Sequence, residues 1–312
     1  MVNILVTDDI DKKAINELRN LNINVVEEKC EECILGIKLR QYDAVITRAS
    51  TNITKEVIDK ACEGRRLKLI LRAGVGVDNI DIEYANKKGI KVVNTPLASS
   101  ISVAELTIAQ IIVIARFINI SNVSMRDGKW EKKHYKGIEI NGKTLGIIGL
   151  GRIGKEVAKR ADALGMKVVY YDILGKMDGY ENYKFCNQEE LLKQADFITL
   201  HTPYDSDRGF LITENEINKM KDGAYLINYA RGGLVKEEDL LEALNKGKIS
   251  AAALDVFEKE PTPNTELVNH PRVSSTPHIG ASTKEAQEKI GSEIVNIISD
   301  YFINDNSNSI AL

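Results

Sequence analysis

The sequence predicts an α/β protein with parallel sheets in two domains. Three observations lead to this class. Short β-rich runs alternate with helical patterns along almost the whole chain. The runs are continuously apolar, as strands covered on both faces should be. The chain has 312 residues, which is long for a single hydrophobic core and natural for two.

The expected strands fall into two series. Each strand is a short run rich in Val, Ile, Leu or Ala that ends at a turn or a polar residue. The first series comprises residues 3–7, 24–26, 44–47, 67–71 and 91–95, and the second comprises residues 144–149, 167–171, 197–200, 224–228, 251–255 and 273–277.

Helical patterns lie between the strands, for example at residues 155–165 and 237–247. This alternation predicts right-handed βαβ units. A longer helix is expected at 101–120, between the two series, and another at 282–302. The helix at 101–120 is apolar around much of its surface, so it is either buried between domains or part of a dimer interface, and we favour the dimer.

The two long helices set the expected domain boundaries. The helix at 101–120 is one crossing, and if the final helix packs on the first domain, the chain crosses back near residue 285. We therefore expect a first domain of residues 1–98 plus 286–312 and a second of residues 99–285.

Composition excludes several classes of partner. The net charge of −3 gives no reason to expect nucleic acid or an anionic membrane. The N-terminus has no cationic segment of a signal peptide, and the most apolar stretch, 106–117, is interrupted by Gln110 and Arg116 before it reaches the ~20 residues of a membrane span. We expect a cytoplasmic protein.

The four cysteines include a CxxC pair, Cys30 and Cys33. Zinc would need two more ligands at suitable spacing, and none lies nearby, so no metal is expected. A thioredoxin-like site would need the pair to open a helix after a strand. Chance spacing and reduced thiols are the favoured interpretation.

The stretch "GLGRIG" places Gly149, Gly151 and Gly154 in GxGxxG spacing. It follows an expected strand and opens an expected helix, which is the context that this motif requires. The first glycine permits the tight turn, the second lets a pyrophosphate approach the backbone, and the third lets the helix pack on the strand. Free N–H groups and the helix dipole then hold the anion.

The next strand ends at Asp172. A carboxylate there can accept hydrogen bonds from both ribose hydroxyls of an adenosine and would repel a 2′-phosphate. Ile173 and Leu174 follow, and no arginine stands there to receive such a phosphate. The pattern therefore favours NAD over NADP.

Polar residues follow strand after strand of the second series. Because ligands of doubly wound sheets bind beyond the carboxyl ends of the strands, these residues are expected at one edge. They are His201, Thr202 and Pro203 after 197–200, Arg231 after 224–228, Asp255 and Glu260 after 251–255, and His278 with Gly280 after 273–277.

Hydride chemistry on an alcohol needs a base for the hydroxyl proton and a fixed cation for a carboxylate. Histidine suits the first role, and the planar fork of arginine suits the second. A carboxylate on the imidazole would orient it and favour its protonated form. Spacing alone does not choose between Glu258 and Glu260 for this carboxylate, and Asp255 could simply cap its turn.

The chain resembles the D-isomer-specific 2-hydroxyacid dehydrogenases, and within them the branch that acts on D-3-phosphoglycerate. Seven motifs in order carry the resemblance, which covers nearly the whole chain. They are "RAGVGVDNID" (72–81), "NTPLASSISVAEL" (94–106), "GLGRIG" (149–154), "HTP" (201–203), "NYARGG" (228–233), "ALDVFEKEP" (253–261) and "TPHIGAST" (276–283).

The resemblance implies two Rossmann-like doubly wound parallel-sheet domains with a cleft between them, the first flavodoxin-like and substrate-binding and the second NAD-binding. It implies Arg231 as carboxylate clamp, His278 as acid/base and Glu260 as its partner. Implied cofactor contacts are Val75, Arg152, Ile153, Asp172, His201, Thr202, Pro203, Tyr229, Ala230, Asp255, Gly280 and Ala281, beside the three glycines. Tyr229 stands where the family usually has a smaller residue.

For the substrate, the resemblance implies the loop Gly74, Val75 and Gly76, whose N–H groups can bind an anion. Arg48 is a candidate for a substrate phosphate, equally well explained as a solvated strand end. Lys132 and Lys133 could reach a partner's site in a dimer formed through the second domain, although a solvated face explains them better.

Three functions remain open. The first is NAD-dependent oxidation of D-3-phosphoglycerate to 3-phosphohydroxypyruvate, the first step of serine biosynthesis. The second is reduction of glyoxylate, hydroxypyruvate or another 2-keto acid. The third is an NAD-sensing interaction protein that turns over no 2-keto acid. Because the chain ends at 312, we also expect a short form without the regulatory domain of longer relatives, and no serine feedback.

Overall fold

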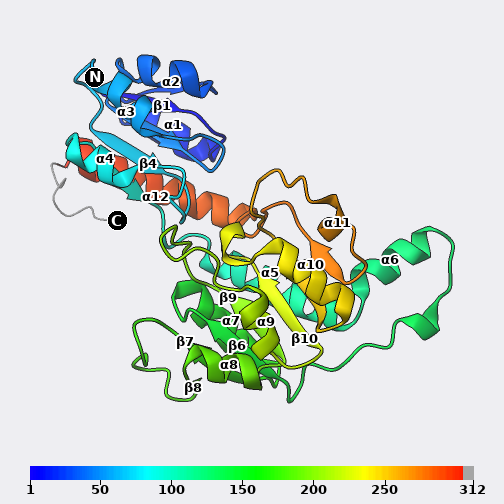
Figure 1. The fold of residues 1–312 in the computed structure, drawn as a ribbon. Helices are drawn as coiled ribbons and strands as arrows, with labels where there is room; N and C mark the ends of the chain where they lie inside the picture. Colours follow the sequence, from blue (N-terminus) through cyan, green and yellow to red (C-terminus); the bar gives the residue numbers. More distant parts are fainter. Residues whose placement is uncertain (305–312) are drawn as a thin grey trace. The chain divides into compact units, whose positions relative to one another are not determined.

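A computed structural model describes residues 1–304 and shows two compact α/β units (Figure 1). The first consists of residues 1–99 with 281–312, and the second of residues 100–280. The chain enters the second unit at residue 100 and returns at residue 281, whereas the sequence prediction places these crossings at 99 and 286. Residues 305–312 of the predicted first domain lie outside the described residues.

Unit 1 is built on a five-stranded parallel sheet in the order β2-β1-β3-β4-β5, which is the flavodoxin-like order. Its central strands are buried along their whole length or nearly so, because helices cover both faces. The strands are β1 (Asn3–Val6), β2 (Asn24–Glu27), β3 (Ala44–Thr47), β4 (Leu69–Arg72) and β5 (Lys91–Asn94).

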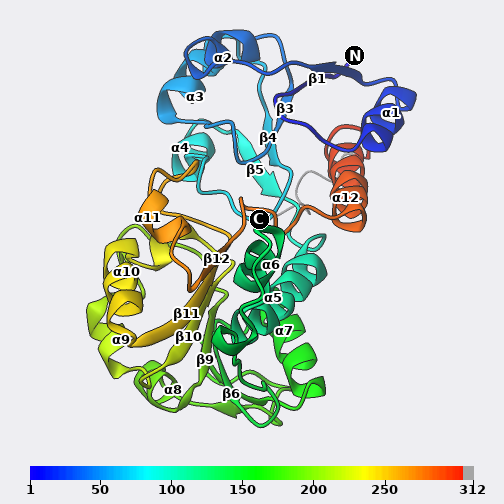
Figure 2. The same cartoon turned by 90° about the vertical axis from the view of Figure 1, so that its right-hand side faces the viewer.

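Helices from both ends of the chain cover this sheet (Figure 2). One face packs against α1 and the C-terminal α12, through Ile15, Leu18 and Ile294. The other packs against α2 and α3, through side chains such as Leu35 and Ile58. The helices are α1 (Lys12–Asn20), α2 (Glu32–Leu39), α3 (Lys55–Cys62), α4 (Ile82–Lys87) and α12 (Lys284–Phe302).

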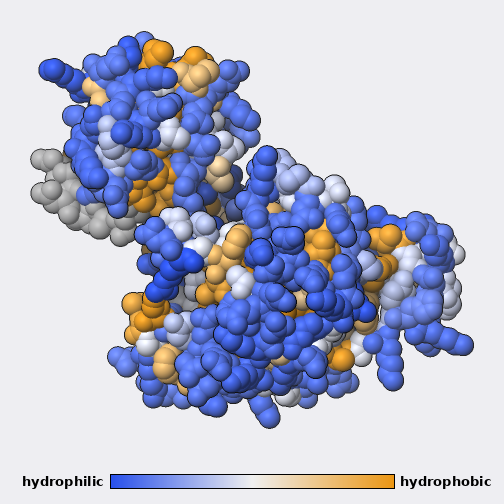
Figure 3. Space-filling view, viewed as in Figure 1, coloured by the Kyte–Doolittle hydropathy of each residue, from blue (hydrophilic) through white to orange (hydrophobic). Residues whose placement is uncertain are grey.

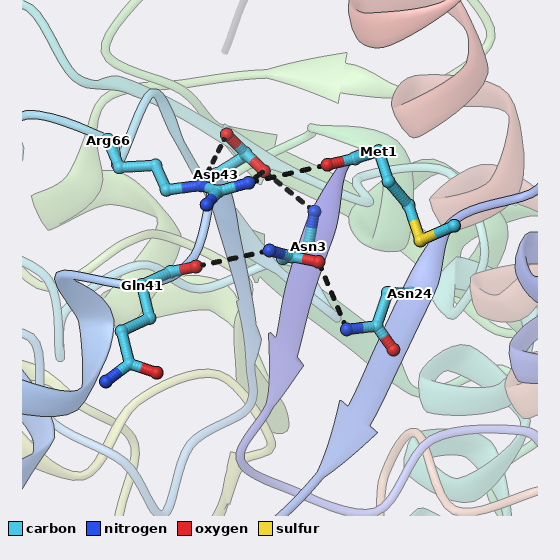
Figure 4. Close-up of polar contacts among 6 residues, drawn as sticks. All are labelled: Met1, Asn3, Asn24, Gln41, Asp43 and Arg66. Atoms are coloured by element: carbon cyan, nitrogen blue, oxygen red, sulfur yellow. Dashed lines mark hydrogen bonds and ion pairs between the residues drawn. The ribbon is translucent and has the colours of Figure 1, made fainter.

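The amino edge of this sheet is fixed by a polar cluster centred on Asp43 (Figure 4). The Asp43 carboxylate accepts the Asn3 backbone N–H at 2.7 Å and two guanidinium N–H groups of Arg66 at 3.0 and 3.1 Å. Burial alone would raise the pKa of Asp43, but the Arg66 hydrogen bond and charge and the Asn3 N–H outweigh it and lower the pKa. Asp43 thus ties the starts of β1 and β3 to the segment before β4.

Unit 2 is built on a seven-stranded sheet in the order β12-β11-β10-β9-β6-β7-β8, with every pair parallel. From β6 onward this is the Rossmann strand order with one further strand at the β12 edge. The strands are β6 (Thr144–Ile148), β7 (Lys167–Tyr171), β8 (Lys184–Phe185), β9 (Phe197–Leu200), β10 (Ala224–Asn228), β11 (Ile249–Leu254) and β12 (Val273–Ser275).

Helices cover both faces of this sheet as well (Figure 2). One face packs on α8, α9 and α10, and the other on α5 and α7. The helices are α5 (Ser100–Ala115), α6 (Ile118–Arg126), α7 (Arg152–Ala163), α8 (Gln188–Gln194), α9 (Glu214–Lys219), α10 (Glu237–Lys246) and α11 (Thr265–Val268), with 3₁₀ turns η1 (Lys132–His134) and η2 (Gly232–Leu234). The two predicted doubly wound parallel sheets are confirmed.

The predicted single helix at 101–120 is wrong in one respect, because it breaks after Ala115. Phe117 adopts a left-handed conformation with φ of 56°, and α6 leaves at 66° to α5. Val103, Ile108 and Ile111 of α5 pack into the core of unit 2, so burial within this unit accounts for its apolar character. No single described helix is long and apolar enough to cross a membrane. Helices α5 and α6 reach that length and apolar composition only when they are taken together as this bent pair.

Candidate active site

The turn after β12 brings His278 into contact with Glu260. The imidazole Nδ1 lies 2.6 Å from Glu260 Oε2, and the two side chains are 41% and 36% exposed. The second oxygen of Glu260 accepts the Phe257 backbone N–H at 3.2 Å. The Nε2 atom of His278 makes no hydrogen bond within residues 1–304, so a proton on that nitrogen is available to a ligand.

The pKa of Glu260 is the balance of opposing effects. Burial alone would raise it, but the hydrogen bond and charge of His278, the Phe257 N–H and the Arg231 charge together lower it. Glu260 is therefore ionised at neutral pH. The Arg231 charge thus acts on the same carboxylate that contacts His278.

Asp255, at the end of β11, holds the His278 turn in place. Its carboxylate is 1% exposed and accepts the backbone N–H groups of Ile279 at 2.8 Å and Gly280 at 2.7 Å, and the Thr276 hydroxyl at 2.6 Å. His278 has φ of 53°, a conformation that costs energy for a non-glycine residue, and these bonds fix the residues that flank it. Asp255 thus acts on the site through the backbone.

Arg231 sits at the start of the turn after β10. The side chain of Asn228, itself 1% exposed, accepts the Ala230 N–H and donates to the Arg231 carbonyl. A Cβ on Gly232 would lie 1.7 Å from the Phe257 carbonyl oxygen, so the turn can pack on the loop that carries Glu260 only with glycine there. The glycine after Arg231 is therefore explained by close approach of two backbones.

Tyr229 and Thr276 connect these turns. The Tyr229 hydroxyl lies 3.2 Å from the Thr276 hydroxyl, which in turn donates to Asp255. The tyrosine side chain is 4% exposed and packs in the core beside β6 and α5, and burial raises its pKa. The structure thus places the ring in the core, where only the backbone of Tyr229 remains for a cofactor.

The glycine turn after β6 has the shape of a phosphate site. Gly149 has φ of 95°, and a Cβ on Gly154 would lie 2.2 Å from the Gly149 carbonyl oxygen. Gly151, by contrast, faces open space, with nothing within 4 Å of a Cβ built there. α7 begins at Arg152 without a side-chain cap, so the first N–H groups of the helix are directed at that space.

Asp172 and the segment after β9 border this turn. One oxygen of Asp172 accepts the Leu150 N–H at 2.8 Å and the other accepts the Leu174 N–H at 2.9 Å, so the carboxylate ties its own loop to the glycine turn. The His201 carbonyl and a Thr202 methyl contact the Gly149 position. His201 Nδ1 and the Thr202 hydroxyl are buried without a hydrogen-bond partner among residues 1–304, as expected of atoms that await a ligand. Pro203 follows directly.

The predicted substrate residues of unit 1 lie at the carboxyl edge of its own sheet. Asn94 donates to the Val75 carbonyl at 2.6 Å and Thr95 N–H to the Gly74 carbonyl at 3.1 Å, which holds the loop that continues to Gly76. Arg48 follows β3 and is half-buried, and its guanidinium donates to the Asp9 carbonyl at 3.2 Å. Ala281 begins the returning segment of this unit and accepts a hydrogen bond from Gln287.

The Arg48 loop is organised by Asp8. The Asp8 carboxylate accepts the Arg48 backbone N–H at 2.6 Å, the Thr47 hydroxyl at 3.0 Å and the Ser50 hydroxyl. Burial alone would raise the pKa of Asp8, but these hydrogen bonds lower it. The Arg48 side chain therefore projects from a backbone that is fixed on one side.

The remaining predicted positions have no site around them. Lys132 and Lys133 are exposed on η1. Cys30 and Cys33 are free thiols, and burial raises the pKa of Cys30. Among residues 1–304 no group of three or more His, Cys, Asp or Glu side chains is arranged to hold a metal ion.

The sequence profile of the D-isomer specific 2-hydroxyacid dehydrogenase NAD-binding domain matches residues 108–280. This range is more than half of the chain and contains the glycine turn, Arg231, Glu260 and His278. The chain belongs to this family. Unit 2 is accordingly the NAD-binding domain of a family member.

Two curated relatives are similar to almost the whole chain. A D-3-phosphoglycerate dehydrogenase of Methanocaldococcus jannaschii is 48% identical over 297 residues, which are 93% of this chain and 56% of the relative. A hydroxypyruvate reductase of Thermotoga maritima is 45% identical over 294 residues, 93% of this chain and 95% of the relative. The chain thus spans just over half the length of the first relative and nearly all of the second.

A solved structure agrees with the fold of this family member. The D-lactate dehydrogenase from Aquifex aeolicus, complexed with NAD and lactic acid, has a TM-score of 0.87 and 31% identity, covering 98% of this chain and 96% of that one. The relatives therefore include proteins with different substrates on one fold.

Sequence reasoning missed one cation at the carboxyl edge of unit 1. Arg72 ends β4 and pairs in register with Thr47, so Arg48 and Arg72 leave neighbouring strands at the same edge. The Arg72 guanidinium folds over Gly74, where a Cβ would lie 1.8 Å from its Nη1, and donates to the Ala73 carbonyl. Strand-end analysis of the first series, applied as it was to the second, would have found this residue.

Proposed function

We propose that this chain is an NAD-dependent dehydrogenase that oxidises D-3-phosphoglycerate to 3-phosphohydroxypyruvate, the reaction that begins serine biosynthesis. The observation that carries the proposal is the 2.6 Å contact between His278 and the ionised Glu260, with the Arg231 charge beside them. These are the acid/base and the cation that hydride transfer to or from a 2-hydroxy acid requires.

His278 takes the proton of the C2 hydroxyl on Nε2 during oxidation and returns it during reduction. Its Nδ1 is already in contact with Glu260, which fixes the orientation of the ring and leaves Nε2 for the substrate. Arg231 grips the substrate carboxylate with its planar fork and polarises the adjacent C2 oxygen. Both side chains are partly exposed, so a small acid can reach them.

The residues of unit 2 fit NAD, which when bound accepts the hydride from C2. The open space at Gly151 and the N–H groups of Arg152 and Ile153 suit its pyrophosphate. The unpartnered Thr202 hydroxyl is a ready donor or acceptor. Asp172 keeps lone pairs for the ribose hydroxyls beyond its two backbone bonds.

The two arginines at the carboxyl edge of unit 1 support a phosphorylated substrate. Arg48 and Arg72 follow or end neighbouring strands, and the Gly74–Gly76 loop lies beside Arg72. The Gly74 N–H already donates to the Arg72 carbonyl at 2.9 Å, which leaves the N–H groups of Val75 and Gly76 for an anion. Guanidinium groups bind phosphate through bidentate, charge-assisted hydrogen bonds. We assign Arg48 and Arg72 to the phosphate and the loop to the carboxylate.

The second candidate is a hydroxypyruvate reductase. It is favoured by the relative of that name, whose length this chain spans almost completely. The same acid/base and clamp perform that reaction, and only the phosphate contacts differ. The deciding experiment measures kcat/KM with NADH for 3-phosphohydroxypyruvate, hydroxypyruvate, glyoxylate and pyruvate. A higher value for hydroxypyruvate than for its phosphate would make the reductase the better assignment, and no turnover of any of the four would contradict both.

We also propose that a second copy of the chain binds at α6 and the segment after it. Val123, Met125 and Trp130 are 57%, 53% and 78% exposed there. In Figure 3 the surface over α6, at the right of the view, mixes apolar with hydrophilic atoms. Light scattering at micromolar concentration should give the mass of a dimer, and a monomer mass would contradict the proposal.

A further inference from the structure

The loop that carries Glu260 is attached to helix α10 by a pair of glutamates that the proposed reaction does not use. The carboxylate of Glu237, the first residue of α10, accepts the backbone N–H of Glu258 at 2.7 Å. The carboxylate of Glu258 accepts the backbone N–H of Glu237 at the same distance. Each side chain thus accepts the backbone N–H of the other residue. These two hydrogen bonds fix Glu258 to the start of α10.

The second oxygen of Glu237 holds the far end of the same loop. It accepts the side-chain Nδ2–H of Asn264 at 2.8 Å, and Asn264 Oδ1 in turn accepts the Leu267 N–H to cap α11. One carboxylate therefore grips the chain on both sides of Glu260, at Glu258 and at Asn264.

Glu237 is a buried charge without a cationic partner. Its side chain belongs to a residue that is only 8% exposed, and no ion pair to it exists among residues 1–304. The Glu237 carboxylate is stabilised there by the two hydrogen bonds donated to it. The dipole of α10 also stabilises it, because Glu237 lies in the first turn of the helix. A buried carboxylate is costly unless its oxygens are hydrogen-bonded, so the bonds from Glu258 and Asn264 are needed to keep it there.

The geometry imposed on this loop reaches the reacting groups in two steps. Glu258 follows Phe257, whose N–H donates to Glu260 and whose carbonyl oxygen packs on Gly232, next to Arg231. A shift at position 258 therefore moves the carboxylate on His278 and the backbone contact beside Arg231 together.

We propose that Glu237 is a positioning residue that sets the Glu260 carboxylate on the imidazole of His278. The inference rests on the proposed dehydrogenase function and deepens it. Glu237 touches neither substrate nor cofactor, and it acts by holding Glu258 and Asn264. Spacing made Glu258 an alternative partner for the histidine, and the structure gives it this second task.

The test exploits the number of acceptors that Glu237 provides. In Glu237→Gln the amide can accept only one of the two N–H groups, and its own NH₂ then faces the other donor. The double variant Glu237→Gln/Asn264→Asp restores the match, because the amide introduced at position 237 donates to the new carboxylate at position 264, which still caps α11. The double variant keeps the net charge of the wild type. Its carboxylate stands at position 264 and its amide at position 237, on the two sides of the same hydrogen bond.

The measured quantities are kcat, KM and the pH profile of kcat/KM for reduction of the best 2-keto acid, with NADH affinity by fluorescence titration. We expect Glu237→Gln to lower kcat about tenfold, a part of the ~10²- to 10⁴-fold that acid/base catalysis contributes. Its pH profile should shift toward that of Glu260→Gln, because the Glu260 carboxylate is no longer held on the imidazole. NADH affinity should change less than about twofold, since the glycine turn is untouched.

The double variant should recover kcat and the wild-type profile to within about threefold. Ile249→Val, a buried change in β11 expected to cost ~0.5–1.5 kcal/mol, is the stability-matched control and should leave the profile in place. An unshifted profile in Glu237→Gln, or a double variant as impaired as the single one, would overturn the positioning role. If the wild type reduces no 2-keto acid, the proposed function fails first, which separates the two failures.

Discussion

At the carboxyl edge of each parallel sheet, carboxylates fix the loops that follow the strands, but the two edges differ in which other charged side chains they carry. In unit 2 the Asp255 carboxylate accepts backbone N–H groups of the His278 turn, and the Glu237 carboxylate holds the loop of Glu260. Glu260 itself accepts the Phe257 N–H of its own turn. In unit 1 a single carboxylate, Asp8, organises the Arg48 loop, and arginines and a glycine loop follow.

The difference matches the two tasks that we propose for these edges. Proton transfer requires an acid/base held within hydrogen-bond distance of the reacting atom, so its turns are fastened together. Phosphate recognition, which we propose for unit 1, needs guanidinium groups at one edge, and Arg48 and Arg72 follow or end neighbouring strands there. Substitutions at the first edge should therefore change turnover, and those at the second should change substrate preference.

The largest effect should come from His278→Ala. Without its imidazole the site has no group to exchange the hydroxyl proton, and kcat should fall by about 10²- to 10⁴-fold. NADH titration should show affinity near that of the wild type, because the glycine turn is intact. Activity within tenfold of the wild type would mean that another group exchanges the proton.

The next effect sharpens the contrast with unit 1. Arg48→Ala and Arg72→Ala should each lower kcat/KM for 3-phosphohydroxypyruvate by about 10- to 100-fold, the worth of one charge-assisted contact, with a much smaller effect on hydroxypyruvate. Arg65→Ala removes the same charge from the exposed turn before β4, at the amino edge, and is the matched control. Equal losses for both substrates would show that the arginines serve the carboxylate or the fold.

The sequence predicts the strands well because each is a buried apolar run, and all eleven predicted runs contain strand residues. It misses β8, two residues with one polar side chain, which is too short to leave a pattern. It also misses the break at Phe117, since nothing local marks an aromatic residue for a left-handed conformation. Strand ends locate the polar residues of the edge, because parallel strands deliver them together.

Contacts between distant turns could not be predicted from spacing. Glu258 and Glu260 are two residues apart in one charged turn, and only the packed loop directs one to α10 and the other to His278. Asp255 is predicted to contact the cofactor, but its carboxylate accepts hydrogen bonds from Thr276, Ile279 and Gly280. Such roles depend on which turns meet in space, and that information is tertiary.

A smaller effect concerns the cofactor. Asp172→Asn keeps one oxygen to accept the Leu150 N–H, loses the acceptor of the exposed Leu174 N–H and removes the charge that repels a 2′-phosphate. The preference for NADH over NADPH, measured as the ratio of kcat/KM values, should narrow by about tenfold, with kcat little changed. An unchanged ratio would show that steric contacts, and not this charge, set the preference.

The smallest effect tests the buried side of the unit 2 edge. Burial lowers the pKa of His201 from 6.5 to about 3, so the folded protein keeps this imidazole neutral while the unfolded chain binds a proton below pH 6.5. The unfolded state then holds more protons in acid, and stability must fall as the pH drops from 7 to 5. His201 as a whole residue is only partly buried, although its ring Nδ1 is buried, and we therefore expect a loss of about 1 kcal/mol. Urea unfolding at both pH values should show a smaller loss for His201→Asn than for the wild type, whereas His134→Asn, at an exposed position, should follow the wild type. Equal losses in all three proteins would mean that His201 gains a partner for its proton and that this edge is open to water.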